Sequence, residues 1–163
     1  MEVKRSNNLR SEGVNEWLLR RTASSFGMDQ CFVMQPFDEG KFDKRYEDTI
    51  KPAIKSAGLK PYRVDEDPSS EVLMETVEEE IARSRVCVAE ITTNNPNVWY
   101  ELGLAHALGI SVVMICSSER NGGFPFDVSH RKIINYETGS KSDFDRLKNK
   151  ISKSLEAKKE NKK

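Results

Sequence analysis

Three short, fully apolar runs limit what this chain can fold into. They are residues 31–34, 86–89 and 112–115, and none alternates polar with apolar residues as a half-exposed strand does. Such runs are typical of parallel strands that are covered on both faces. Stretches with helical spacing of apolar side chains alternate with strand-like runs along the chain, so the sequence predicts an α/β sheet with helices on both faces.

Two weaker runs complete the predicted sheet. Residues 60–64 are more polar and contain Pro61, which suits a sheet edge, and residues 132–136 follow a Gly-rich loop. With the three buried strands in the centre, we predict a doubly wound parallel sheet of five strands in the order 2-1-3-4-5. Ligands of such sheets bind beyond the carboxyl ends of strands one and three. Helices are predicted over 43–57, where Pro52 predicts a kink or a break, and over 71–84, 97–108 and 142–155.

One carboxylate of the third predicted helix lies on an unexpected side. At about 100° per residue, Glu101 falls in the middle of the apolar stripe that contains Val98, Ala105 and Leu108. An unpaired charge that faces a sheet is unfavourable. Glu101 therefore either caps a turn or pairs with a buried arginine, or it faces a cleft and takes part in chemistry. A place in the first helical turn would let the helix N-terminus stabilise the anion.

Composition excludes several classes of protein. The 163 residues carry a formal net charge of zero, which gives no general attraction to nucleic acid or to an anionic membrane. The three cysteines lie in apolar runs without metal-ligand spacing, so we expect buried free thiols and no metal site. No apolar run is long enough for a membrane span. We expect a cytoplasmic protein with an appendage over 1–28, one domain over 29–157 and a disordered basic tail over 158–163.

Three sequence blocks resemble a known group of proteins. Residues 32–37 (FVMQPF), 88–92 (VAEIT) and 95–109 (NPNVWYELGLAHALG) are similar to the nucleoside 2-deoxyribosyltransferase-like group, which is close in fold to bacterial TIR-like domains. The resemblance implies a flavodoxin-like fold, cleavage of N-glycosidic bonds without a cofactor, and Glu101 as the catalytic carboxylate. It also implies a homo-oligomer. The group commonly has Asp where this chain has Glu90.

The chemistry that the resemblance implies suits residues at the predicted switch point. A carboxylate held against C1′ of a ribose stabilises an oxocarbenium-like state or forms a covalent ester. A second acid would protonate the leaving base or hold the hydroxyls, and an aromatic ring would stack on the base. The candidates are Asp65, Asp67 and Glu90 as second acids, Phe37 and Tyr100 as stacking rings, and Gln35, Asn97 and Ser117 as hydrogen-bonding groups. A strand-terminal cap for Glu90 and a solvated acidic loop for Asp65 and Asp67 are the structural alternatives.

Two functions follow as hypotheses. The first is an enzyme that cleaves the N-glycosidic bond of a nucleoside, a nucleotide or NAD by hydrolysis or transfer, with a role in prokaryotic defence signalling. The second is a TIR-like module that senses a nucleotide or self-associates without cleaving anything. In both, the partner is a small molecule, and neither nucleic acid nor a membrane takes part.

Overall fold

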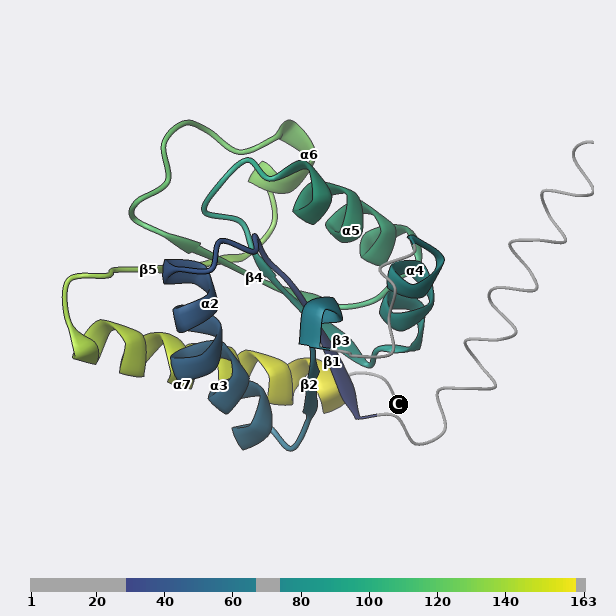
Figure 1. Ribbon diagram of the computed structural model, residues 1–163, viewed down its shortest axis with the longest axis horizontal. Helices are drawn as coiled ribbons and strands as arrows, with labels where there is room; N and C mark the ends of the chain where they lie inside the picture. Colours follow the sequence, from purple (N-terminus) through teal and green to yellow (C-terminus); the bar gives the residue numbers. More distant parts are fainter. Residues whose placement is uncertain (1–28, 67–73, 161–163) are drawn as a thin grey trace, which may run out of the picture.

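The computed structural model describes residues 29–66 and 74–160, which form one parallel sheet with helices on both faces (Figure 1). The strand order is β2-β1-β3-β4-β5, which confirms the predicted order 2-1-3-4-5. The strands are β1 Gln30–Met34, β2 Lys60–Tyr62, β3 Val86–Glu90, β4 Val112–Ser117 and β5 Ile133–Tyr136. The helices are α2 Lys41–Arg45, η1 Tyr46–Ile50, α3 Lys51–Ser56, η2 Val64–Glu66, α4 Met74–Arg83, α5 Pro96–Ala107, α6 Phe126–Ser129 and α7 Lys141–Glu160.

The sheet separates two apolar cores because its central strands carry apolar side chains on both faces. Helices α2, η1, α3 and α7 cover one face, with Tyr46, Ile54 and Ile151 in its core. Helices α4 and α5 cover the other face, with Ile81 and Leu102 in its core (Figure 1). Alternate residues of each central strand belong to different cores, and this arrangement accounts for the unbroken apolar runs in the sequence.

The first predicted helix is continuous but not regular. Helical backbone runs from Lys41 through Ser56, and its central segment, η1, is a π-helix. Pro52 lies in the first turn of α3, immediately after that segment. Proline has no backbone N–H to donate to the preceding turn, and a π-helical turn changes the hydrogen-bonding register there. The helical backbone is therefore not broken near Pro52, where the helix type changes from π to α.

The chain ends differ from the expected boundaries. Helix α7 extends to Glu160, so the predicted disordered tail over 158–163 is corrected for its first three residues. Lys159 explains the extension, because its Nζ donates to the Ala57 carbonyl at 2.9 Å and its own carbonyl accepts from Arg85 at 2.9 Å. The predicted appendage over 1–28 lies outside the described residues. Among the helices that the structure describes, none has the length and apolar content of a membrane span.

Candidate active site

A cleft of about 430 Å³ opens beyond the carboxyl end of β1, where that strand borders the start of α5. Its walls come from the loop after β1, from the segment after β2, from α4 and from the first two turns of α5. This is the switch point at which doubly wound sheets bind ligands. The lining residues are Gln35, Phe37, Val64, Val77, Asn95, Asn97, Tyr100 and Glu101. Five of them were predicted from the sequence as site residues.

Asn95 caps the N-terminus of helix α5. The Oδ1 atom of Asn95 accepts from the backbone N–H groups of Asn97 and Val98, at 2.9 and 3.2 Å, and Pro96 occupies the first helical position. Both features are strong starting signals for a helix. Glu101 is consequently the sixth helical residue and lies in the second turn, not in the expected first turn. The helix dipole weakens within one turn, so it stabilises this carboxylate less than the sequence analysis assumed.

Glu101 is a half-buried carboxylate in the second turn of α5. No hydrogen bond or ion pair joins it to any residue in the described part of the chain. Burial raises its pKa to about 7, because the ionised form loses solvation that no group in the described ranges replaces. The capping and ion-paired alternatives for Glu101 are thus without support among residues 29–66 and 74–160. A group that titrates near neutral pH in a cleft is suited to acid–base or nucleophilic chemistry.

Gln35 forms part of the cleft wall with its side chain held in place. Only 4% of the residue is exposed, and its Nε2 donates to the Phe42 carbonyl at 3.3 Å and to Asp43 at 3.4 Å. Its Oε1 is buried and has no hydrogen-bond partner among the described residues. An acceptor buried in this way is unfavourable unless a donor reaches it. A ligand hydroxyl or amino group in the cleft would supply that donor.

Arg63 organises one side of the cleft and was missed by the sequence analysis. The guanidinium is buried, donates to Asp43 at 2.9 Å and to Asp65 at 2.6 Å, and lies 5.3 Å from the ring centre of Phe37. Asp65, a predicted substrate contact, is therefore paired with Arg63 and does not line the cleft. An arginine beside a polar edge strand ordinarily points to solvent, so no sequence signal distinguished it except the aspartate two residues later.

The two predicted stacking rings lie at the mouth of the cleft. Phe37 is 53% exposed and Tyr100 is 48% exposed, which leaves much of each ring uncovered by the protein. Tyr100 is oriented by a hydrogen bond of 2.7 Å from its hydroxyl to Glu78 of α4. Asn97 is also exposed there. These groups suit the binding of a planar ring and of hydroxyl groups.

Two other predicted contacts, Glu90 and Ser117, are absent from the cleft wall. Glu90 is 1% exposed; Tyr136 donates to its Oε2 at 2.6 Å, and its Oε1 accepts from both the backbone N–H and the hydroxyl of Thr92. Burial raises its pKa, against these hydrogen bonds. Ser117 is buried and donates to Glu119 at 3.1 Å. Both side chains are occupied by the protein itself. Asp67 lies outside the described residues.

The described residues contain no group of three or more His, Cys, Asp or Glu side chains placed to hold a metal ion. The chemistry that they can perform themselves rests on Glu101, with donors, acceptors and rings around it. That set suits reactions at a carbon that gains positive charge.

Comparison with solved structures identifies the architecture. A CMP N-glycosidase from Clostridium botulinum, BcmB, is 15% identical, with a TM-score of 0.53 over 72% of this chain and 97% of that chain. The TIR domain of the Toll-related receptor TRR-2 from Hydra magnipapillata is 13% identical, with a TM-score of 0.56 over 78% of this chain and 98% of that domain. The chain has a TIR-like fold. At these identities the similarity shows the fold alone.

Sequence comparison adds nothing further, since neither a protein-family description nor a curated protein matches the chain. The TIR-like fold places the cleft where both the sequence analysis and the strand order put a ligand. Assignment of an activity therefore rests on the residues of the cleft.

Proposed function

We propose that this protein cleaves the N-glycosidic bond of a nucleoside-type small molecule, with Glu101 as the essential carboxylate. The single observation that carries the proposal is a half-buried carboxylate, unpaired among the described residues, in the cleft at the switch point of the sheet. The CMP N-glycosidase that shares this fold supports it as an analogy. The substrate range of the proposal covers nucleosides, nucleotides and NAD, and its setting extends to a homo-oligomer in prokaryotic defence signalling.

The reaction develops positive charge at C1′ as the bond to the base breaks. Ionised Glu101 would stabilise that charge or form a ribosyl ester, while the bonding electrons leave with the base nitrogen, which then takes a proton. Water attack at C1′ gives the free sugar, and attack by a second base gives transfer. Phe37 and Tyr100 would hold the base. Gln35 would accept a hydrogen bond from a sugar hydroxyl, and Asn97 would donate one or accept one.

Partial burial makes the Glu101 carboxylate more effective at stabilising positive charge on the substrate. Its negative charge acts on C1′ through a poorly solvated cleft, where electrostatic stabilisation is stronger than in water. A pKa of about 7 means that ionised and protonated Glu101 coexist at neutral pH. The ionised form is the one that the proposed step uses, so base release should increase as the pH rises through this value.

A binding module is the second candidate, and one observation favours it. Glu101 is the only carboxylate among the described residues that line the cleft, since Glu90 and Asp65 are engaged elsewhere. Without a second acid, the cleft would hold a nucleotide or nucleoside without protonating the leaving base. This candidate predicts saturable binding in calorimetry with no free base after long incubation.

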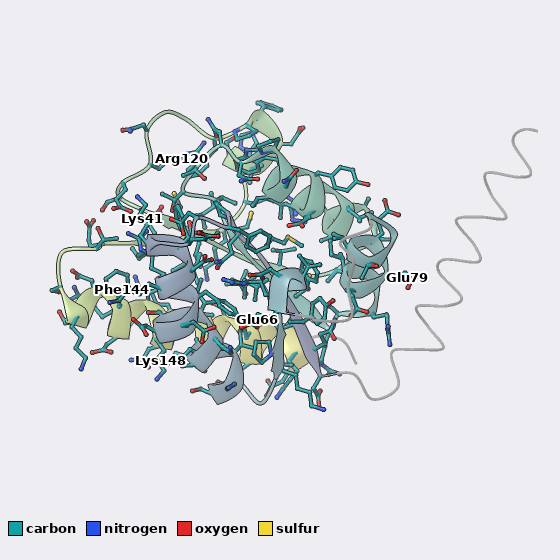
Figure 2. All side chains as sticks on the ribbon, in the orientation of Figure 1. Lys41, Glu66, Glu79, Arg120, Phe144 and Lys148 are labelled. Atoms are coloured by element: carbon teal, nitrogen blue, oxygen red, sulfur yellow. The ribbon has the colours of Figure 1, made fainter. Side chains whose placement is uncertain are left out.

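Replacement of the central carboxylate tests the enzyme proposal. In Glu101→Gln, base release measured by chromatography should fall by about 100-fold or more, the scale expected for loss of a main electrostatic group. Glu79→Gln is the matched control, because Glu79 lies on the exposed side of α4 at the edge of the molecule (Figure 2). Its turnover should equal that of the unaltered protein. Unchanged base release by Glu101→Gln would exclude the mechanism.

A further inference from the structure

We infer that the cleft selects an unphosphorylated nucleoside over the corresponding 5′-phosphate, an inference that rests on the proposed function and narrows its substrate class. The starting observation is the charge of the cleft wall. Among the eight described lining residues, Glu101 is the only one with a formal charge, and none is a lysine or an arginine. A phosphate group that entered this cleft would meet a carboxylate and no cation.

The residues that contact the cleft wall add more negative charge. Asp43 and Asp65 both pair with Arg63, at 2.9 and 2.6 Å. The single positive charge of this guanidinium is thus opposed by two carboxylates. Glu78 accepts the hydroxyl of Tyr100 at 2.7 Å. Together with Glu101, these make four acids in or against the described cleft wall, and the one guanidinium beside them, Arg63, is buried and already paired with two of them.

The start of α5 is also closed to an anion. Helix N-termini bind phosphate through their free backbone N–H groups. Here the Oδ1 of Asn95 already accepts from the N–H groups of Asn97 and Val98, so two of those donors are occupied by the protein's own cap. A phosphate would have to displace this cap, and it carries about −1.5 to −2 charges at neutral pH.

An unsatisfied hydrogen-bond acceptor in the cleft wall also favours a nucleoside over its monophosphate. The buried Oε1 of Gln35 needs a donor, and an ionised phosphate offers only acceptors. Of the groups in which the two ligands differ, only the free 5′-hydroxyl of the nucleoside provides a donor. Gln35 cannot simply turn its amide around, because its Nε2 already donates to two acceptors, the Phe42 carbonyl and Asp43.

Lysine side chains gather on another part of the described structure. Four lysines line a separate groove of about 500 Å³ between α2 and α7, which cover the sheet face opposite to α4 and α5. Figure 2 shows Lys41 and Lys148 on that side and Glu79 on the side of α4. Among the described residues, the cleft wall is therefore acidic, whereas this groove is rich in lysine.

Ligand binding tests the inference separately from catalysis. The unaltered protein, whose cleft keeps Glu101, is titrated calorimetrically with formycin and pseudouridine, two C-nucleosides that have no N-glycosidic bond to cleave, and with their 5′-monophosphates. The best-bound nucleoside should bind at least tenfold more tightly than its own monophosphate. Equal or tighter binding of the monophosphate would overturn the inference, and so would no binding of any compound. Base release by the unaltered protein decides the proposed function independently.

A charge reversal at the mouth of the cleft is a second test of the inference. Glu78→Lys should reduce the preference for the nucleoside at least threefold, because it places a cation beside Tyr100. Glu78→Gln controls for the hydrogen bond, and Glu79→Lys controls for the same charge change at an exposed neighbour and should leave the preference unchanged. The preference should also shrink between low and high salt, since exposed charges are screened. A preference independent of salt and of Glu78→Lys would contradict an electrostatic origin.

Discussion

Glu101 lowers the stability of the folded protein at the pH where it would work. Its pKa rises from an ordinary 4.5 to about 7 on folding, because burial removes water from the ionised form. The folded state therefore binds more protons than the unfolded state between these values. The contribution of protonated Glu101 to the free energy of unfolding is fully present below about pH 4.5 and is lost as the pH rises through about 7.

The same residue gives the first stability prediction. Glu101→Gln should raise the free energy of unfolding by about 2–3 kcal/mol at pH 8 and change it little at pH 4, since one pKa unit corresponds to about 1.4 kcal/mol. Urea unfolding at the two pH values measures both quantities. Glu79→Gln, an exposed control, should show no such difference. A destabilised Glu101→Gln at pH 8 would mean that the carboxylate has a structural partner.

At the scale of elements, Arg120 joins the loop before α5 to the loop after β4. One guanidinium nitrogen donates to the Ile91 carbonyl at 2.8 Å, and another donates to Asn94 at 2.8 Å and to the Gly123 carbonyl at 2.6 Å. The group also lies 4.6 Å from the ring centre of Phe124. Figure 2 labels this arginine. These contacts of Arg120, which we call the clamp, fix the loop that precedes α5. They thereby help to position the helix that carries Glu101.

Removal of the clamp should destabilise the protein measurably. Arg120→Ala should lower the free energy of unfolding by about 2–3 kcal/mol, because it leaves several carbonyl groups without their donor. Arg146→Ala removes an exposed arginine whose ion pair is with Asp143 three residues away, and should change stability by less than about 0.5 kcal/mol. Denaturant unfolding compares the two variants. Equal losses would show that the contacts of Arg120 contribute no more than a surface pair.

Elements and cleft differ in how far the sequence predicts them. Apolar runs and capping residues are local signals, so the five strands, their order and the start of α5 near Asn95 follow from the sequence. Pairing partners are not local. Arg63 reaches Asp43 only after the chain has folded, and Glu90 loses its expected role because Tyr136, 46 residues away, occupies one of its oxygens. The π-helical segment η1 has no recognisable pattern of its own.

At the scale of the whole molecule, a buried polar network ties together the carboxyl ends of three strands and α2. The Tyr136 hydroxyl of β5 donates to Glu90 of β3 at 2.6 Å and accepts from Arg45 of α2 at 3.3 Å. Arg45 in turn pairs with Glu119 at 2.7 Å, just after β4. Burial and the neighbouring Glu90 carboxylate raise the pKa of Tyr136, so its hydroxyl stays protonated and keeps donating.

Loss of the Tyr136 hydroxyl should therefore lower the stability of the folded protein. Tyr136→Phe should reduce the free energy of unfolding by about 1–3 kcal/mol, because a buried carboxylate and a buried guanidinium each lose a partner. Tyr100→Phe deletes a comparable bond to Glu78 at an exposed position and should have an effect below about 0.5 kcal/mol. Thermal unfolding followed by circular dichroism checks both. A neutral Tyr136→Phe would show that the network is dispensable for stability.

The three cysteines of the chain, Cys31, Cys87 and Cys116, are all buried in the sheet. Burial raises the pKa of Cys31 and of Cys116, which keeps these thiols protonated and unreactive at neutral pH. The folded molecule thus presents no native thiol to an alkylating probe. A single cysteine introduced at position 79 would accept a fluorophore against a silent background, and unfolding or self-association of the otherwise unaltered protein could then be followed by light emission.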